Sequence, residues 1–155
     1  TIRYNDQLLD YKFNDWKSFI GYVPQNVKLI DDSIINNISF GDEKINKEQI
    51  EKAIKISQLN NYVLNLPNGL QNLIGEGGEK ISGGQRQRIG IARAVIHEPR
   101  ILIFDESTNS LDKETEASLL NDIMLLNKDN NMSLVVVSHD YEILKKYCKK
   151  ILKVE

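Results

Sequence analysis

A pair of carboxylates, Asp105-Glu106, directly follows an apolar run at residues 101–104 of this 155-residue chain. A carboxylate at the end of a buried strand can hold Mg²⁺ beside phosphates. A neighbouring carboxylate can position or deprotonate an attacking water molecule. An isolated Asp-Glu pair is more often a cap for the next turn, so this interpretation depends on what accompanies the pair.

A second polar cluster, Ser138-His139-Asp140, follows another apolar run at residues 134–137. In a parallel sheet, ligands bind beyond the carboxyl ends of the strands, and these ends lie on one edge. We therefore expect this cluster and the carboxylate pair to lie on the same edge. A single histidine in such a place is more often an ordinary surface or core residue.

The longest pattern is at residues 81–94, where Ser82 and Gln85 form a capping box that predicts a helix starting after Gly83 or Gly84. The two glycines allow close approach of another group to the backbone. The free N–H groups of such a helix end attract an anion such as phosphate. On the capping box alone, an ordinary capped helix is the favoured reading.

As a whole, residues 81–94 resemble the signature sequence of ATP-binding cassette (ABC) ATPases, with Ile81 where the family most often has Leu. In that family two nucleotide-binding domains face each other head to tail. The signature of one domain contacts the γ-phosphate of ATP held by the P-loop of the other. The resemblance implies a second nucleotide-binding domain as partner, and it implies ATP contacts from Ser82, Gly83, Gly84 and Gln85.

The carboxylate pair resembles the Walker B element of the same family, since Asp105 follows Ser82 by 23 residues, as the family pattern expects. The resemblance implies that Asp105 serves the metal and that Glu106 is the general base. His139 is similar in position to the family's switch histidine, which contacts the γ-phosphate. A neutral imidazole can do this by donating a hydrogen bond.

Gln25, in the sequence Tyr22-Val23-Pro24-Gln25, resembles the glutamine of the family's Q-loop. In the family this residue reaches Mg²⁺ and the attacking water, so the resemblance gives Gln25 both a catalytic and a metal role. The same loop links the ATP site to the membrane-spanning part. We therefore expect the Gln25 loop to contact transmembrane coupling helices.

Residues 109–112 occupy the D-loop, usually Ser-Ala-Leu-Asp; Asp112 fits this pattern, whereas Asn109 and Ser110 depart from it. The resemblance gives Asp112 a nucleotide-site role, but a helix cap is an equally open interpretation. The contacts of this loop across the dimer also stay open.

The sequence Gly75-Glu76-Gly77-Gly78-Glu79 resembles the exporter-type loop that touches the coupling helices. It favours an exporter over an importer. From three glycines and three charges, residues 75–80 are predicted to form an exposed loop, and a loop that is simply solvated is the alternative to the exporter-type role.

The elements that must position these residues alternate between strands and helices, which favours a parallel α/β sheet. The runs at 101–104 and 134–137 are continuously apolar, so we predict strands buried on both faces. Helices are predicted at 34–38, from residue 47 on, at 59–64, from just after Gly83 or Gly84 to before Pro99, at 112–126 and at 141–147. Further strands are predicted at 1–4, 20–23 and 151–154.

By resemblance the fold is a P-loop NTPase-like parallel sheet core with a helical signature subdomain, truncated at its N-terminal side. We expect one partial ABC ATPase domain over residues 1–155. Its core sheet region would comprise residues 1–41 and 98–155, and its helical subdomain residues 42–97.

Composition limits the classes of function. The net charge is −2 with mixed signs along the chain, which gives no case for a nucleic-acid partner. A single cysteine, Cys148, excludes an internal disulfide. The chain contains no Gly-x-x-x-x-Gly-Lys-Ser/Thr sequence, and therefore no P-loop. Because it opens on a strand pattern and its first methionine is Met124, we expect a piece of a longer protein.

These patterns predict part of an ABC exporter ATPase, with ATP and Mg²⁺ as cofactors, on the cytoplasmic side of a bacterial inner membrane. The isolated chain should be inactive without a P-loop. Soluble ATPases of DNA repair or chromosome organisation are an alternative, although they usually carry coiled coils or zinc insertions, and only 57 residues separate Gln25 from Ser82. A non-catalytic interaction fragment is a second alternative.

Overall fold

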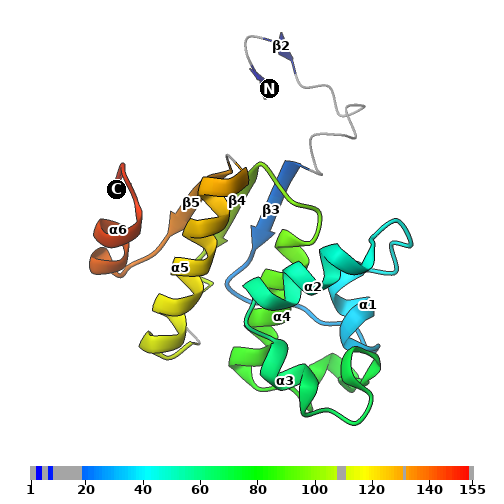
Figure 1. Cartoon of the computed structure of the whole chain (residues 1–155). Helices are drawn as coiled ribbons and strands as arrows, with labels where there is room; N and C mark the ends of the chain where they lie inside the picture. Colours follow the sequence, from blue (N-terminus) through cyan, green and yellow to red (C-terminus); the bar gives the residue numbers. More distant parts are fainter. Residues whose placement is uncertain (1–2, 5–6, 9–18, 108–110, 131, 154–155) are drawn as a thin grey trace.

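The computed structural model describes residues 3–4, 7–8, 19–107, 111–130 and 132–153 (Figure 1). A short antiparallel pair, β1 (Arg3–Tyr4) and β2 (Gln7–Leu8), stands apart from a parallel sheet of order β3-β4-β5. The sheet strands are β3 (Ile20–Val23), β4 (Ile101–Asp105) and β5 (Ser133–Val137). The predicted α/β class and the parallel pairing are confirmed.

One face of this sheet is buried and the other is not. Leu102 and Phe104 are fully buried in a core that includes Ala92, Leu119 and Ile123 of the two longest helices. On the opposite face, the exposed fractions are 51% for Tyr22, 36% for Ile101, 45% for Val135 and 48% for Val137. The prediction of strands buried on both faces was therefore wrong: helices of the described part pack on one face, so alternate side chains reach solvent. These four residues are called the open sheet face below.

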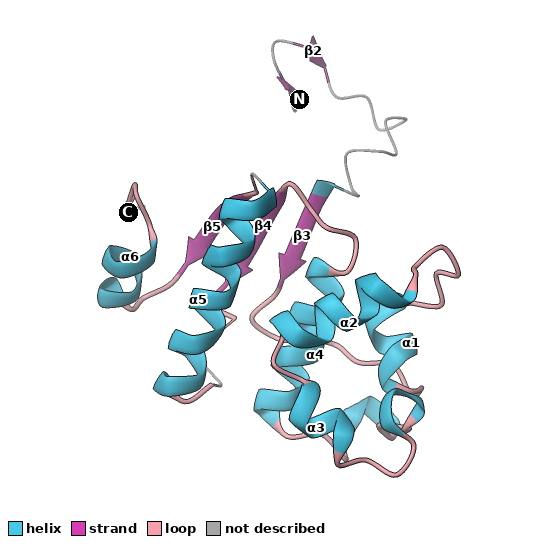
Figure 2. Ribbon diagram, viewed as in Figure 1, coloured by secondary structure: helices cyan, strands magenta, loops and turns pink. Residues whose placement is uncertain are grey.

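Two helices follow the sheet strands, α5 (Lys113–Asn130) and α6 (Tyr141–Tyr147) (Figure 2). The strand predicted at 151–154 does not form at residues 151–153, and residue 154 lies outside the described part. A strand needs a hydrogen-bonded neighbour, and in the described part β5 is the edge of the sheet on that side.

The segment between β3 and β4 forms a helical lobe, residues 33–97. Each of its four α-helices begins at the predicted residue or within two of it. The lobe contains α1 (Ile34–Ser39), α2 (Lys47–Ile56), α3 (Asn60–Leu64), α4 (Gly83–Val95) and two 3₁₀ turns, η2 (Gly69–Gln71) and η3 (Glu76–Gly78).

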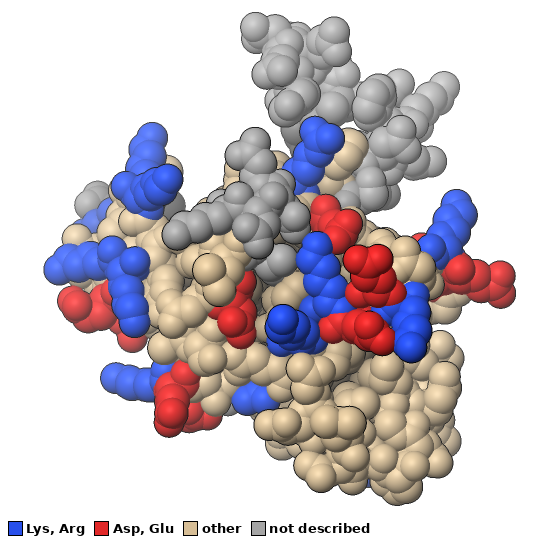
Figure 3. All heavy atoms as spheres, viewed as in Figure 1, with Lys and Arg blue, Asp and Glu red and all other residues tan. Residues whose placement is uncertain are grey.

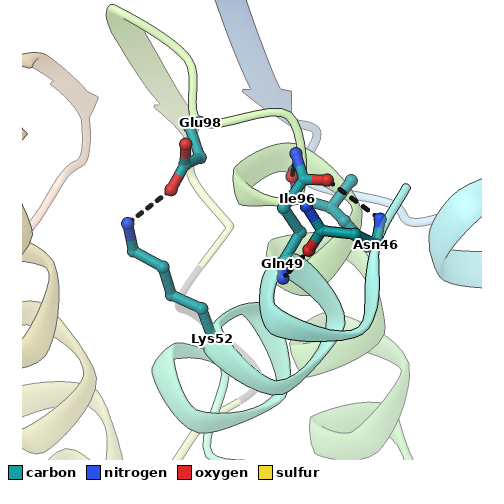
Figure 4. Close-up of polar contacts among 5 residues, drawn as sticks. All are labelled: Asn46, Gln49, Lys52, Ile96 and Glu98. Atoms are coloured by element: carbon teal, nitrogen blue, oxygen red, sulfur yellow. Dashed lines mark hydrogen bonds and ion pairs between the residues drawn. The ribbon is translucent and has the colours of Figure 1, made fainter. Parts of the chain in front are cut away.

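Side chains close the polar ends of these helices, which explains why they start where they do. Ser33 accepts from the N–H of Asn36 at the start of α1, and Asn46 forms a capping box with Gln49 at the start of α2. Figure 4 shows how α2 is then tied to the segment after α4: Gln49 donates to the carbonyl of Ile96, and Lys52 pairs with Glu98.

The long helix α4 joins the lobe to the sheet. At Gly21 of β3, a Cβ would lie 2.3 Å from the carbonyl oxygen of Ala94, so the strand and helix backbones touch. At Gly90, a Cβ would lie 2.4 Å from the side chain of Val27, in the segment after β3. The position of the loop after β3 is therefore coupled to that of α4.

The surface carries mixed charges, except over part of the lobe (Figure 3). Residues 57–75, which include α3 and η2, contain no Lys, Arg, Asp or Glu. Within this uncharged surface the side chains of Leu64 and Leu73 are 81% and 60% exposed. In the part of the chain that the structure describes, no helix has the length and apolar character needed to cross a membrane.

Candidate functional site

Glu106 is the centre of a cluster at the carboxyl end of the sheet. Its Oε2 accepts a hydrogen bond of 2.8 Å from Nε2 of Gln25, and its Oε1 lies 2.6 Å from Nε2 of His139. Its own N–H donates to the carbonyl of Val137, with φ of +47° in the left-handed region. Three residues singled out in the sequence, far apart along the chain, thus meet at one carboxylate.

The parallel register explains this meeting. Gln25 is the second residue after β3, Glu106 the first after β4, and His139 the second after β5. Parallel strands bring these three positions to one edge, as expected for Glu106 and His139. The Glu106 side chain is only 19% exposed, whereas that of His139 is 91% exposed. A fixed carboxylate of this kind is suited to orienting or deprotonating a water molecule.

Asp105 has a different partner. Its Oδ2 accepts a hydrogen bond of 2.7 Å from the hydroxyl of Tyr22. This bond to the carboxylate raises the pKa of Tyr22 from its ordinary value, so the phenol remains a donor at neutral pH. The sequence analysis did not single out Tyr22, because its approach to Asp105 depends on the register of β3 and β4, which the sequence does not give.

The four signature residues form the start of α4 as predicted. Ser82 accepts from the N–H of Gln85 at 3.2 Å, and Gln85 accepts from the N–H of Ser82 at 2.9 Å. The helix begins at Gly83, and Ser82 and Gly83 are exposed while Gly84 and Gln85 are half-buried. Within the described part of the chain, no side-chain hydrogen bond joins these residues to Asp105, Glu106 or His139.

The turn at residues 75–79 is attached to α4 and is not simply solvated. Arg86 donates to the carbonyls of Gly77 and Gly78 at 2.7 and 3.0 Å, and Gly75 and Gly78 are buried. The expectation of an exposed loop is therefore wrong for these two glycines, although Glu76 and Glu79 do face solvent. A guanidinium satisfying two carbonyls of a glycine-rich turn fixes its shape.

Two further residues of α4 reach other parts of the molecule. Gln87 is buried and its Nε2 lies 3.5 Å from the carbonyl of Pro24, beside Gln25. Arg88 donates to the carbonyl of Gln58, at the end of α2. The polar residues of the signature helix thus connect the turn, the lobe and the loop after β3.

Asp112 acts as a helix cap in this structure. Its Oδ1 accepts from the N–H of Thr115 at 2.9 Å, and these hydrogen bonds lower the pKa of Asp112. Its D-loop neighbours Asn109 and Ser110 lie outside the described residues.

The donor set around the carboxylates suits a hard cation. In the described ranges no group of three or more His, Cys, Asp or Glu side chains is placed to hold a metal alone. Mg²⁺, however, is usually bound by one or two carboxylates together with phosphates and water. Asp105 supplies a carboxylate. Gln25 contacts Glu106 through its amide nitrogen, so its amide oxygen is available as a second ligand.

Comparison with known proteins decides the family. The sequence pattern described as "ABC transporter" matches residues 1–109, well over half of the chain. The chain belongs to the ABC transporter family. The family predicted from the sequence is confirmed.

Relatives and a solved structure agree with this family assignment. "Multidrug resistance-like ATP-binding protein MdlA" of Buchnera aphidicola is 42% identical over 139 residues, which is 89% of this chain and 24% of the relative. "ATP-dependent lipid A-core flippase" of Wigglesworthia glossinidia brevipalpis is 40% identical over 92% of this chain and 24% of its own length. The chain thus spans about a quarter of these curated relatives.

The fold also matches a solved member of the family. "Structure of a bacterial Atm1-family ABC exporter with ATP bound" is similar with a TM-score of 0.72 and 32% identity. The match covers 83% of this chain and 22% of that one. The nucleotide-binding fold expected from the sequence is confirmed.

Proposed function

We propose that this chain supplies the hydrolytic residues and the signature of an ATPase that drives export across a membrane. The observation that carries the proposal is the Glu106 carboxylate, held from two sides by Gln25 and His139 at the carboxyl end of a parallel sheet. Such a carboxylate is oriented before any substrate arrives, as a catalytic base requires.

In this proposal Glu106 accepts the proton of the attacking water, and Gln25 orients both that water and the base. His139, with its exposed ring, donates its N–H to the γ-phosphate when ATP is bound, in place of its contact with Glu106. Asp105 and the amide oxygen of Gln25 hold Mg²⁺, which neutralises charge on the phosphates when bound.

The rest of the ATP site lies outside this sequence. A P-loop supplies most backbone donors to the phosphates, and no such sequence is present in the chain. We propose that the P-loop of a second nucleotide-binding domain holds the ATP contacted by Ser82, Gly83, Gly84 and Gln85. Asp112 adjoins the same interface. The isolated chain is therefore inactive.

The membrane domain is the second proposed partner. Gln87 and Arg86 connect α4 to the loop of Gln25 and to the turn at 75–79, so both loops move with the signature helix. The uncharged surface at 57–75, next to that turn, suits contact with coupling helices.

We propose that the sheet region comprises residues 1–41 and 98–155 and that the helical subdomain comprises residues 42–97. We place the whole domain on the cytoplasmic side of the membrane.

Export is favoured over DNA repair by the names of the relatives, which include a flippase and "Putative export ATP-binding/permease protein RP696" of Rickettsia prowazekii, 41% identical over 84% of this chain.

The test is ATP hydrolysis by the intact protein carrying Glu106→Gln, with the exposed Glu43→Gln as matched control. We expect hydrolysis to fall at least about 100-fold while Mg-ATP binding is retained, since general-base catalysis contributes 10²–10⁴-fold. The control should hydrolyse ATP normally. Wild-type hydrolysis by Glu106→Gln would exclude Glu106 as the base.

A further inference from the structure

Tyr22 and Asp105 lie on the same face of the sheet although 83 residues separate them. Tyr22 of β3 is in register with Ile103 of β4, and alternate residues of a strand share a face. The side chain of Asp105, two residues beyond Ile103, therefore projects on the Tyr22 side. The hydroxyl of Tyr22 closes the remaining gap with a hydrogen bond of 2.7 Å to Oδ2.

The Tyr22 ring is not held by burial, and its specific contact is the hydrogen bond to Asp105. Its side chain lies on the open sheet face and is 51% exposed, whereas Val23, the next residue, is fully buried. In the described part of the chain, Tyr22 is the only side chain seen to donate a hydrogen bond to the Asp105 carboxylate. A ring needed only for packing would not require the hydroxyl.

A donor to one carboxylate oxygen fixes the rotamer of the group and leaves the other oxygen for a cation. Such partners of metal ligands typically set metal affinity by orienting the ligand. Here the donor sits on a hydrogen-bonded strand, where positions are held more closely than on loops.

We propose that Tyr22 is a positioning residue for Asp105: its hydroxyl holds the carboxylate in the orientation that binds Mg²⁺ and so determines the affinity of the site for the cation. The inference rests on the proposed function, in which Asp105 holds the metal. Tyr22 itself touches neither the metal nor ATP.

The experiment measures Mn²⁺ binding by electron paramagnetic resonance in the intact protein with ADP present, using Tyr22→Phe, which keeps the ring and removes the hydroxyl. We expect about ten-fold weaker Mn²⁺ binding, at the lower end of the usual effect of such residues. The Mg²⁺ concentration for half-maximal hydrolysis should rise by the same factor, with kcat at saturating Mg²⁺ within about two-fold of wild type. Tyr147→Phe, which removes a hydroxyl that donates to the carbonyl of Ala117, is the matched control and should change neither quantity.

Two outcomes would overturn the inference. The first is that Tyr22→Phe binds Mn²⁺ as tightly as wild type, whether or not its thermal midpoint falls. The hydroxyl would then have no part in positioning Asp105, and the ring would serve packing alone. Asp105→Asn separates this failure from failure of the proposed function. If Asp105→Asn loses Mn²⁺ binding while Tyr22→Phe does not, only the role of Tyr22 is wrong; if Asp105→Asn also binds Mn²⁺ normally, the metal role of Asp105 is wrong as well.

Discussion

The helical lobe and the sheet differ in how completely each is packed. In the lobe, the fully buried side chain of Asn37 is paired: it accepts from the N–H of Ile30 and donates to the carbonyls of Ile30 and Ser33. In the sheet, one face is a fully buried core and the other exposes Val135 and Val137. The signature sequence therefore lies on the helical lobe, while the residues proposed to hydrolyse ATP lie at the edge of a sheet that is covered on one face.

This difference matches the division of roles. The signature needs only a fixed helix start, which its capping box and Arg86 provide within the chain. The carboxylates need a phosphate cradle beside them, and no P-loop sequence is present here. An exposed apolar sheet face of this kind favours contact with further protein.

The largest stability effect should separate the two regions. Asn37→Ala removes three hydrogen bonds made by a fully buried amide, at a cost of about 2–3 kcal/mol. Val135→Thr, on the open sheet face, should change stability by less than about 0.5 kcal/mol. Urea unfolding of the chain measures both, with the exposed Asn61→Ala as control for the first. Equal effects of the two changes would mean that the regions do not differ in packing.

A smaller, pH-dependent effect is expected at Asp112. Hydrogen bonds to Thr115 lower the pKa of Asp112 in the folded protein. Asp112 therefore stabilises the fold fully at pH values above its pKa in the unfolded chain, about 3.9. This stabilisation is lost as the pH falls through the pKa of the folded protein. Asp112→Ala should lower the urea midpoint slightly at pH 7 and not at pH 2. The effect is small because the carboxylate is exposed. If Asp112→Ala lowers the urea midpoint equally in acid and at pH 7, the carboxylate does not act as the cap.

Much of the fold could be read from the sequence because its signals are local. The capping box at Ser82 and Gln85 fixes where α4 starts, and the parallel sheet follows from strands alternating with helices. Burial could not be read in this way: the run at 134–137 is apolar throughout, yet half of it is exposed because cover depends on elements remote in sequence.

In the candidate site, too, the sequence predicted what local patterns determine and missed contacts between elements remote in sequence. Glu106 and His139 were predicted to share one edge, since each follows a strand and parallel strands end on one edge, whereas Gln25 was predicted from the family resemblance alone. Tyr22 was missed because its partner depends on strand register, and the role of Arg86 was missed because nothing local indicates a contact with the turn at 75–79.

We propose that the signature of one copy completes the ATP site of another. A dimer in which the two copies differ at the signature tests this, because it shows which copy retains ATP. Both copies of the intact protein carry Glu106→Gln so that ATP is not hydrolysed, and only one carries Ser82→Arg, which places bulk and charge at the signature. After free nucleotide is removed, photoreactive azido-ATP should label the copy that carries Ser82→Arg, because the site lost is the one on its partner. Label on the unsubstituted copy, or equal label on both, would contradict the account.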